Sequence, residues 1–405
     1  MVFLPFSFLA TVSLFIWLYI LFDPVRPWDF LPVGDDDAMP ELPAGTVYPN
    51  VSIIVPARNE ADSLPKTLPA LLSQDYPGEF RVILVDDRSS DGTAEIARSI
   101  ANQSGKPERL IVLTGAPLPR GWTGKVWALD QGVKAANPSI PDSYFLLTDA
   151  DILHSPSSLK RLVSESLTAK LGLNSRMARL RCNSPAERLL VPAFVFFFNL
   201  LYPMRKVNRA SDKMAAAAGG CVLLSEAAID GLGRGFESIR GEIIDDVNLG
   251  RQVKRLGLPI RLSLSRSEVL SLREYPVLGD IWRMVRRTAF TELKYSWLLL
   301  AGAQIGLVLL FVIPPAALVS GVIGAVLIAD SFTQLLAAAL AVKGLLALII
   351  MRTVYTPAVR FFELPGGYKL TLPWCGVLYG LMTLDSACRH AAGKRLEWRN
   401  SQGPV

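Results

Sequence analysis

Between residues 50 and 150, short apolar runs alternate with segments of helical spacing. The run Val51–Val55 predicts a buried strand, residues 56–59 a turn and residues 61–72 a helix. The pattern repeats in a strand that ends at Asp86-Asp87, a polar turn with Asp91 as a helix cap, and a second helix. A third strand, a helix over residues 124–136 and a fourth strand in "YFLLTDAD" follow. Strands that alternate with helices predict an α/β fold with a mainly parallel sheet and helices on both faces.

Longer apolar segments occupy both ends of the chain. Phe3–Phe22 is uncharged and long enough to cross a bilayer, and it is favoured over a cleaved signal peptide because no basic segment precedes it. The run from Trp297 passes through Pro314-Pro315 and is too long for one untilted crossing, so it predicts either a helix plus a loop or a hairpin. Leu335–Met351 is a further span, and Leu370–Leu384 either crosses or lies in the interface.

These patterns divide the chain into five expected parts. They are an N-terminal membrane anchor (1–24), a linker (25–49), a catalytic domain (50–296), a C-terminal membrane region of two to four apolar segments (297–388) and a basic tail (389–405). Within the domain, an apolar stretch near 189–204 precedes Arg205-Lys206. It predicts an interfacial helix, with a buried core helix as the alternative.

Composition agrees with a membrane protein, since 51% of the residues are hydrophobic and the mean hydropathy is +0.33. The net charge of +6 comes mainly from basic residues near the apolar segments, which favours an anionic lipid surface and a diphosphate ligand over nucleic acid. Four cysteines lack zinc spacing, and the histidines are only two, His154 and His390. A histidine-based triad or a multi-histidine metal site is therefore excluded.

Basic residues beside the spans predict the orientation. Arg283, Arg286, Arg287 and Lys294 precede the first C-terminal span, so the positive-inside rule predicts a multi-pass protein of the cell (inner) membrane whose catalytic domain is cytoplasmic. Two further basic groups compete for the cytoplasmic side: Arg352, Arg360 and Lys369 in one, and Arg389, Lys394, Arg395 and Arg399 in the other. Both are satisfied only if the last apolar segment does not cross.

Candidate chemistry lies where the predicted strands end. Asp149-Ala150-Asp151 follows an apolar strand, and Asn59 and Asp87 follow two others, at the strand ends where ligands of such sheets collect. The acidic pair suits Mg²⁺ or Mn²⁺ and a diphosphate, with a turn cap as the alternative. Lys125 follows Gly124 at a helix start, which favours anion binding, although a solvated lysine would also fit there.

Five motifs then carry a family resemblance. "IIVPARNE", "LVDDRSSDGT", "GKVWALDQG", "TDAD" and "EIIDDVNLGRQVKRLG", in this order, resemble the family 2 inverting glycosyltransferases with a GT-A fold, over roughly residues 50–287. "LPRGWTGKVWALDQG" and "LLVPAFVFFFNLLYP", with the membrane segments, are similar to the hopanoid-biosynthesis-associated glycosyltransferases, relatives of ceramide glucosyltransferases.

The resemblance implies a nucleotide-sugar donor of the UDP type and a site with two acidic centres. The expected donor-binding residues are Pro56, Ala57, Asn59, Glu60, Asp87, Lys125, Asp149, Gly219 and Gly220. Asp151, with Asp149, would hold the metal ion, and Asp246 would be the general base beside Asp245, where the family commonly has Glu. A pair of helix-dipole carboxylates, a structural ion pair for Arg58 and Glu60, and a simple turn at Gly219-Gly220 are the structural alternatives.

The arginine cluster departs from the family pattern. Arg283-x-x-Arg286 fits the first part of a Gln/Arg-x-x-Arg-Trp motif, but Arg287 stands where tryptophan is expected. Arg286 is interpreted as a diphosphate clamp, and Arg283 and Arg287 either as lipid-surface residues or as residues that set the membrane topology. Trp122 and Trp127 would line the sugar pocket or pack in the core.

Together these features predict transfer of a sugar to the hydroxyl of a membrane lipid, and the resemblance implies a role in hopanoid biosynthesis. A polysaccharide-forming synthase and a non-catalytic membrane scaffold are the alternatives.

Overall fold

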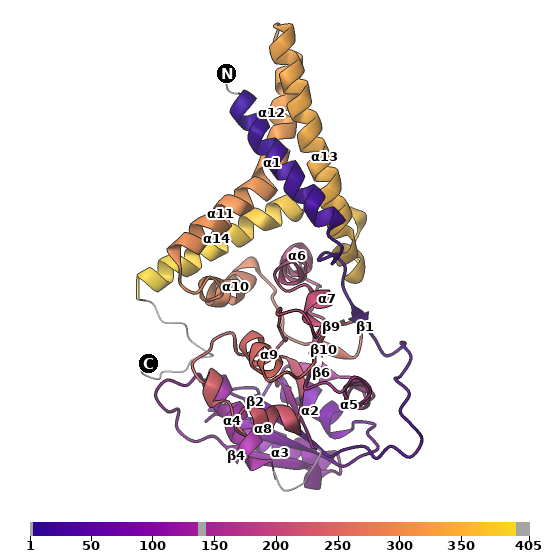
Figure 1. Ribbon diagram of the computed structural model, residues 1–405. Coiled ribbons are helices and arrows are strands. Elements are labelled where there is room, and N and C mark those ends of the chain that lie inside the picture. The colour runs from indigo at the N-terminus through magenta and orange to yellow at the C-terminus, as the bar shows by residue number, and fades with distance from the viewer. Residues whose placement is uncertain (1–2, 137–142, 394–405) are drawn as a thin grey trace. The chain divides into compact units, whose positions relative to one another are not determined.

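The computed structural model describes residues 3–136 and 143–393, which form two compact units (Figure 1). The α/β unit comprises residues 31–136, 143–181 and 204–274. The helical unit comprises residues 3–30, 182–203 and 275–393. Lys394, Arg395 and Arg399 of the expected basic tail lie outside the described residues.

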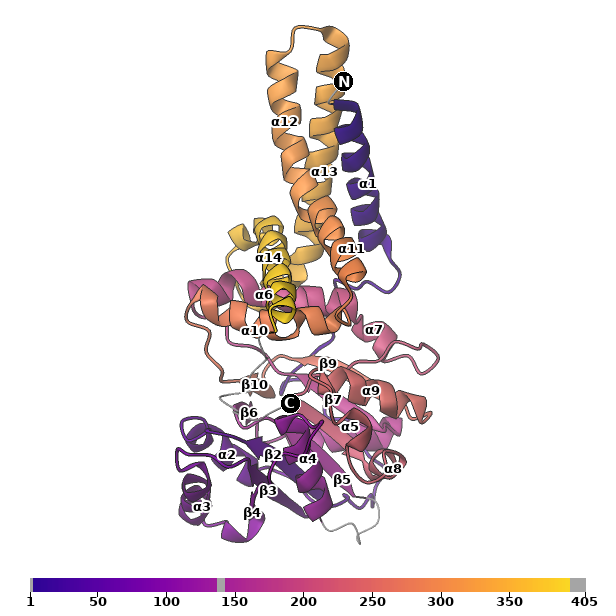
Figure 2. The ribbon, with the colours of Figure 1, turned by 90° about the vertical axis from the view of Figure 1, so that its left-hand side faces the viewer.

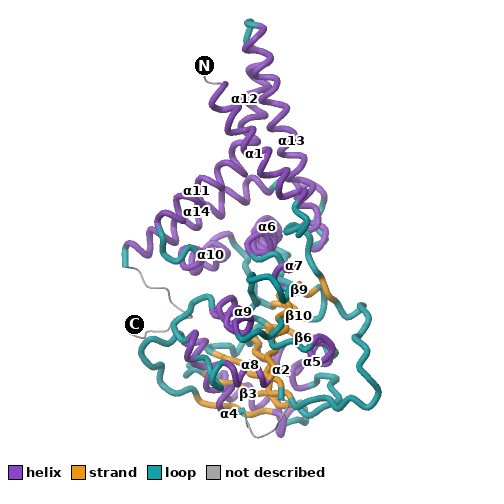
Figure 3. The backbone as a smooth tube through the Cα atoms, in the orientation of Figure 1, coloured by secondary structure: helices purple, strands orange, loops and turns teal. Residues whose placement is uncertain are grey.

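A mixed sheet forms the centre of the α/β unit, and all described strands belong to this unit (Figure 3). Its strand order is β1-β9-β7-β8-β5-β2-β3-β4. The strands are β1 (Pro32–Val33), β2 (Val51–Ala57), β3 (Phe80–Asp86), β4 (Leu110–Thr114), β5 (Tyr144–Thr148), β7 (Leu173–Met177), β8 (Cys221–Ser225) and β9 (Ile260–Ser265). Only β8 runs antiparallel to its neighbours, β5 and β7. A small second sheet pairs β6 (Ile152–His154) with β10 (Val269–Ser271).

The end of β2 differs from the predicted turn, because Pro56 and Ala57 complete the strand by pairing with β3. On its other side, β2 pairs with β5 only as far as Ile54. Pro56 therefore lies where the strand has one partner, so its missing N–H leaves no ladder position unsatisfied on that side.

Helices cover both faces of the sheet, as predicted. The helices are α2 (Leu64–Leu72), α3 (Thr93–Gln103), α4 (Gly124–Ala135), α5 (Ser158–Ala169), α7 (Met204–Val207), α8 (Glu226–Gly231) and α9 (Asp245–Arg255). Val51, Ile53 and Val55 share a buried core with α2, α3 and α5. Alternate residues point to the opposite face, where Gly132 of α4 lies so close to Ile54 that an added Cβ would be 2.3 Å from its Cγ2.

A buried ionic network joins the linker to this unit. Arg176 is fully buried and bridges Glu165 and Glu268, with 3.1 Å between its Nε and Oε2 of Glu268. Arg161 pairs with the same Glu268 and donates from Nη1 to the carbonyl of Ala38 at 2.8 Å. Since β1 also extends the sheet beside β9, the expected linker is an ordered part of this unit from residue 31 on.

The helical unit contains α1 (Phe3–Phe22), α6 (Pro185–Leu201), α10 (Leu278–Glu292), α11 (Trp297–Leu307), α12 (Ile313–Leu327), α13 (Ser331–Phe361) and α14 (Leu372–Ala391). Among the described residues, four helical segments are long and apolar enough to cross a membrane: residues 4–22, 185–207, 297–327 and 331–361. Helix α14, which contains most of the predicted segment Leu370–Leu384, is not among them. These helices have the composition of a membrane protein.

The apolar run from Trp297 is helical to Leu327 and is followed by a short loop. Of the two arrangements that the sequence left open, it is thus the helix plus a loop and not the hairpin. A π-helical turn, Val308–Val312, joins α11 to α12 just before Pro314-Pro315. Prolines are tolerated at a helix start, and a wider turn accommodates the lost i→i−4 bonds. The reversal of direction comes only after Leu327.

Small residues and polar bonds hold the three long helices together. Figure 2 shows α1, α12 and α13 side by side. A Cβ on Gly321 would lie 2.4 Å from the backbone nitrogen of Ala341, so α12 and α13 are in backbone contact there. Lys343 of α13 donates to Ser7 Oγ of α1 at 2.7 Å.

Helix α6 is packed within the helical unit, where Tyr379 of α14 donates its hydroxyl to the carbonyl of Leu190 at 3.0 Å. The ring of Phe197 meets those of Phe311 and Tyr379 edge-on, at centroid distances of 5.6 and 5.1 Å. The segment predicted near 189–204 is therefore largely a helix, and it packs with the apolar helices of its own unit.

Replacing Arg176 by Met should strongly destabilise the α/β unit. The change removes the guanidinium shared by two buried carboxylates, at a cost of about 3–5 kcal/mol. The expected fall in the Tm of the purified protein is roughly 6–20 °C, measured by tryptophan fluorescence in detergent.

Arg98→Met is the matched control, because Arg98 forms only an exposed pair with Glu95, 3.8 Å away. Such pairs contribute about 1 kcal/mol or less. Equal shifts for the two variants would contradict a stabilising role of the network.

Candidate functional site

The candidate site lies at the edge of the sheet where β2, β3 and β5 end. Because β8 is antiparallel to β5, its first residue Cys221 pairs with Thr148, the last residue of β5. The glycines before β8, Gly219 and Gly220, are thereby placed beside the start of the acidic run at Asp149. The structure thus brings together two groups of predicted residues that are 70 positions apart in the chain.

Lys125 is the cation at the centre of this edge. Its Nζ lies 2.8 Å from Oδ1 of Asp149 and 3.9 Å from Oδ2 of Asp245. Burial opposes the charged form, but the attraction of Asp149, Asp245 and Asp246 outweighs it and raises the pKa of Lys125 above its ordinary value. The site therefore holds a permanently charged ammonium group among carboxylates. The alternative of a solvated lysine is wrong, since the side chain is 22% exposed and ion-paired.

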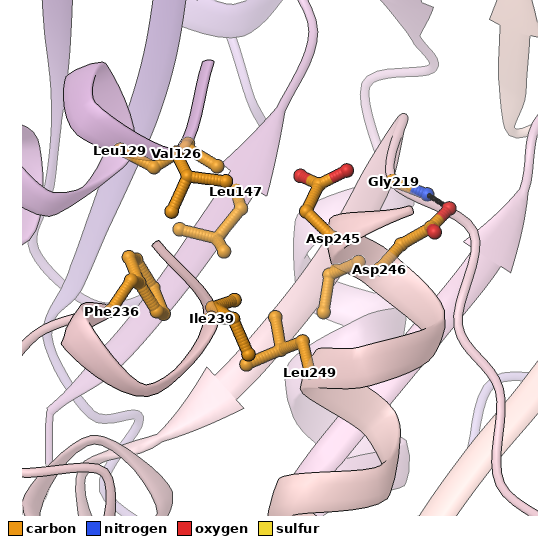
Figure 4. A pocket seen from close by; sticks show the side chains of 10 residues that line it. Val126, Leu129, Leu147, Gly219, Phe236, Ile239, Asp245, Asp246 and Leu249 are labelled. Carbon is orange, nitrogen blue, oxygen red and sulfur yellow. Dashed lines mark hydrogen bonds between the residues drawn. The ribbon is translucent and has the colours of Figure 1, made fainter. Parts of the chain in front are cut away.

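Asp246 is held by two backbone N–H groups. Its Oδ2 accepts from Gly219 and its Oδ1 from Val247, both at 2.8 Å (Figure 4). A Cβ on Gly219 would lie 3.1 Å from Nζ of Lys125 and 3.3 Å from Oδ2 of Asp246. Glycine thus allows the backbone to approach both charged groups, which a simple turn would not require.

The pKa of Asp246 is raised from 3.8 to about 6, first by burial and then by the negative charge of Asp245. Lys125 and the two N–H donors act in the opposite direction and limit the rise. A carboxylate with a pKa near 6 is ionised at neutral pH yet accepts a proton more readily than an ordinary aspartate. This is the property required of a general base.

An apolar recess adjoins the two aspartates at the start of α9 (Figure 4). Its apolar walls are Val126, Leu129, Leu147, Val222, Phe236, Ile239 and Leu249. Such walls exclude water from one side of the carboxylates, in agreement with the raised pKa of Asp246.

Phe236 is fixed in this wall by Asp130, a residue that sequence reasoning missed. The carboxylate of Asp130 is fully buried, accepts from the backbone N–H of Phe236 at 2.8 Å and pairs with Lys134 at 2.7 Å. The signal was an acidic residue on the apolar face of the predicted helix over residues 124–136, beside Val126 and Val133. A buried carboxylate needs partners, so that position indicated a structural contact.

The loops after β2 and β3 are joined to each other. Arg58 donates from Nη1 to Oδ2 of Asp87 at 2.9 Å. Arg58 thus forms an ion pair, as in the structural alternative for Arg58 and Glu60, and its partner is Asp87. Burial raises the pKa of Asp87 despite this guanidinium. Asn59, at φ 54°, accepts on Oδ1 from the N–H of Ser90 at 2.9 Å. Asparagine tolerates this left-handed conformation better than most residues.

Backbone bonds complete this loop region. The N–H of Asp87 donates to the carbonyl of Ala57 at 2.8 Å, and that of Glu60 donates to Oγ1 of Thr93 at 2.9 Å. The N-cap of helix α3 is Gly92 and not Asp91, the predicted cap, which precedes it. The carboxylate of Asp91 still accepts from the N–H of Thr93 at 3.1 Å. The expected nucleoside-binding residues thus lie at the end of β2 and in two loops that hydrogen bonds join to each other.

The acidic run itself forms a tight turn between β5 and β6. The N–H of Ile152 donates to the carbonyl of Asp149 at 3.2 Å, and the carbonyl of Asp151 accepts from Leu272 at 2.9 Å. In the described part of the chain, no three His, Cys, Asp or Glu side chains are placed to hold a metal ion by themselves. Two carboxylates plus the oxygens of a bound diphosphate are a usual environment for Mg²⁺. The residues therefore fit a cation that binds with a phosphate ligand.

Arg286 belongs to the helical unit, where its Nη1 lies 3.2 Å from Oδ2 of Asp385. Trp282 donates to the same oxygen at 2.8 Å, and Arg283 pairs with Asp280. The role of Arg286 as a diphosphate clamp stays a prediction.

The two tryptophans of the α/β unit stack edge-on. The ring centroids of Trp122 and Trp127 are 5.0 Å apart, and Trp127 donates its indole N–H to the carbonyl of Ala116 at 3.1 Å. These contacts anchor the loop before α4, which begins directly before Lys125.

Comparisons with known proteins agree with this architecture. Residues 52–230 match glycosyl transferase family 2. The chain is 28% identical over 221 residues to a 4,4'-diaponeurosporenoate glycosyltransferase of Staphylococcus haemolyticus, covering 53% of this chain and 54% of the relative. It is 34% identical over 127 residues to an undecaprenyl-phosphate mannosyltransferase of Micrococcus luteus, covering 31% and 48%. The chain thus spans about half the length of these curated relatives.

A solved mannosyltransferase from Pyrobaculum calidifontis, in complex with GDP-Man and Mn²⁺, resembles the whole chain. The TM-score is 0.54 at 18% identity, with 96% of this chain and 99% of that chain covered. This likeness confirms the predicted fold class.

The raised pKa of Asp246 predicts how its replacement affects stability. Because folding raises the pKa, the ionised carboxylate destabilises the folded state, and this effect builds up as the pH rises from 3.8 to about 6. The Tm of Asp246→Asn minus the Tm of the parent protein should therefore be larger at pH 8 than at pH 4.5, by roughly 4–8 °C. Thermal unfolding at a series of pH values measures this difference.

Asp36→Asn, at an exposed position, is the control and should show no such pH dependence. A Tm difference for Asp246→Asn that does not change with pH would contradict the assignment of a raised pKa.

Proposed function

We propose that this protein, whose residues 52–230 match glycosyl transferase family 2, transfers a sugar with inversion from a nucleoside-diphosphate donor to a hydroxyl of a membrane lipid. The observation that carries the proposal is the cluster of Lys125, Asp149, Asp245 and Asp246 at the carboxyl edge of the sheet. The cluster offers an ammonium group for a departing anion and a carboxylate base within one site.

The donor half of the site would consist of the loops after β2, β3 and β5. Asp87 and Asn59 would contact the nucleoside, and Lys125 would bind the diphosphate near the N-terminus of α4, where the helix dipole also favours an anion. Asp151, with Asp149, would hold Mg²⁺ or Mn²⁺, which supplies positive charge to the leaving diphosphate. Gly219 and Gly220 would allow the donor sugar to approach the backbone.

Asp246 would remove the proton from the acceptor hydroxyl. The oxygen would then attack the anomeric carbon in line with the departing diphosphate, which inverts the configuration at that carbon. The two backbone N–H donors keep the Asp246 carboxylate in a fixed orientation, and the apolar recess limits competing water.

A hydroxyl acceptor is favoured by the base itself. An alcohol needs a proton acceptor to become a good nucleophile at neutral pH, whereas a phosphate monoester is already ionised. A carboxylate with its pKa raised to about 6 serves the first purpose. The four apolar segments and two relatives named for lipid substrates support an acceptor from the membrane.

The resemblance noted in the sequence narrows this proposal further. It supports UDP as the donor nucleotide, a hopanoid or similar polycyclic or sphingoid lipid as the acceptor, and a catalytic domain on the cytoplasmic side of the cell membrane. The basic residues around α10 would then face the anionic lipid surface.

Lipid mass spectrometry of cells with and without the gene is the experiment that tests this acceptor class. Loss of a glycolipid identifies both the sugar and the lipid by mass. Long sugar polymers made by the purified protein would favour a polysaccharide synthase instead. A purified protein without metal-dependent donor binding would favour a scaffold.

Asp246→Asn and Asp151→Ala should each lower transfer at least about 1,000-fold. The first change removes the base, and the second removes a ligand of the metal ion that would neutralise the leaving diphosphate. The measurement is radiolabelled sugar transfer to extracted lipid, with chelation by EDTA as a parallel treatment that should also abolish transfer.

Glu95→Gln, on the exposed surface of α3, is the matched control and should retain full activity. An active Asp246→Asn enzyme would refute the base assignment.

The pH profile provides a separate prediction. Since Asp246 must be ionised, kcat/KM for the acceptor should fall as the pH drops through about 6. Asp245→Asn should move this limb to lower pH, because it removes a charge that raises the pKa of Asp246. Lys125→Met should move it to higher pH, because it removes a charge that lowers that pKa. Shifts in the reverse directions would contradict this electrostatic account.

A further inference from the structure

Behind the acidic turn lies a buried polar chain that the proposed chemistry does not use. Thr148 Oγ1, at the end of β5, is 2.9 Å from the carbonyl of Gly220 and 2.8 Å from Nε2 of His154. The other ring nitrogen, Nδ1, is 3.1 Å from Oγ of Ser158, which is 3.1 Å from Oε1 of Gln74. His154 is only 2% exposed.

The chain contains four links but too few protons to satisfy all of them. The hydroxyls of Thr148 and Ser158 bring one proton each, and a neutral imidazole brings one more. Burial lowers the pKa of His154 to about 4, so the ring is neutral at physiological pH. Three protons are therefore available for four hydrogen bonds. The acceptor at one end of the chain, either Gly220 or Gln74, must therefore lack a hydrogen bond from it.

The tautomer of His154 decides which end that is. With the proton on Nε2, the ring donates to Thr148, whose hydroxyl then donates to the carbonyl of Gly220. With the proton on Nδ1, the ring donates to Ser158, and Thr148 must turn its proton toward Nε2 and away from Gly220.

The two ends differ in what else can satisfy them. Oε1 of Gln74 also accepts from the N–H of Leu159 at 3.1 Å, which is an ordinary hydrogen bond. The carbonyl of Gly220 also accepts from Asp149, but at 3.4 Å, which is long. The Nε2–H tautomer leaves Oε1 of Gln74 without a hydrogen bond from Ser158, but this oxygen still has the N–H of Leu159 as a donor. The Nε2–H tautomer is therefore the favoured form.

We propose that His154, as its Nε2–H tautomer, is a positioning residue of the donor site that acts through Thr148 to fix Gly220 beside the acidic turn. This inference rests on the proposed function, because the site it shapes is the donor site. Gly219, the next residue along, donates its N–H to Asp246 at 2.8 Å. The glycine pair is thus held at one end by Thr148 and at the other by the base.

The expected consequence is a change in donor binding. If the Gly220 carbonyl loses its bond to Thr148, the glycine pair is free to shift relative to Asp149 and Lys125, where the diphosphate would bind. A buried acceptor without its donor corresponds to about a tenfold loss of affinity. The chemical step should change less, since neither His154 nor Thr148 touches the reacting atoms in this scheme.

Nitrogen-15 NMR of the full-length protein tests the tautomer without any activity measurement. The sequence has two histidines, so ¹⁵N-histidine labelling gives two sets of ring signals, and His154→Gln assigns them. At pH 7.5 we expect His154 to show a protonated Nε2 and a bare Nδ1, and to keep this pattern with a UDP-sugar and Mg²⁺ added. A protonated Nδ1, or a doubly protonated ring, would overturn the inference. Failure of the proposed function would leave this readout intact.

Kinetics of matched variants test the positioning role. Thr148→Val removes the hydroxyl at nearly constant shape and should raise the donor KM about tenfold with little change in kcat, whereas Thr148→Ser should remain near the parent value. His154→Leu leaves the Thr148 hydroxyl able to donate to Gly220 but removes the group that orients it, so the donor KM should rise less than in Thr148→Val. His154→Gln, whose amide can still donate to Thr148, should recover most of that loss.

The double variant His154→Leu/Thr148→Val separates positioning from general packing. If His154 acts through Thr148, the double variant should bind the donor no more weakly than Thr148→Val alone. Additive losses, or an unchanged donor KM in Thr148→Val, would overturn the proposal. If His154→Leu fails to fold, the Thr148 pair and the NMR pattern still decide the question.

Discussion

The candidate site depends on the balance between one ammonium group and three carboxylates in a partly buried space. Lys125 is 22% exposed on its side chain and lies between Asp149 and Asp245, and its charge also lowers the pKa of Asp246. Without a cation, three acidic groups at one sheet edge would repel one another and would favour protonated forms. The lysine joins the turn after β5 to the start of α9 through its ion pairs with Asp149 and Asp245. Binding of a metal–diphosphate ligand would then exchange one set of ionic partners for another.

Much of this arrangement was predictable from local patterns. The alternation of apolar strands and helices gave a mainly parallel sheet, and the residues after each strand, Asn59, Asp87 and Asp149, do lie at its carboxyl edge. The direction of β8 was not predictable, because "CVLLS" carries no signal for its partners. Strand direction is decided by non-local pairing with β5 and β7, and that pairing is what brings Gly219 to Asp246.

The division of the chain shows the same limit. Expected boundaries follow chain order, whereas the compact units collect segments that are far apart, such as α6 and α14 in the helical unit. The bonds from Tyr379 to Leu190 and from Cys375 to Leu189 join residues almost 190 positions apart. A hydropathy pattern identifies these helices but cannot identify their neighbours.

The backbone bonds to Asp246 explain why its pKa is raised to about 6 and not further. Burial and the neighbouring Asp245 disfavour the charged carboxylate, while Lys125 and the N–H groups of Gly219 and Val247 favour it. If burial acted alone, the group would remain protonated at neutral pH and could not act as a base. If the donors acted alone, the carboxylate would be too weak a base to accept a proton from an alcohol. The intermediate value therefore requires both the apolar recess and the glycine at position 219, whose missing side chain permits the N–H contact. In this way the fold, through one antiparallel strand and one small residue, sets the proton affinity on which the proposed transfer depends.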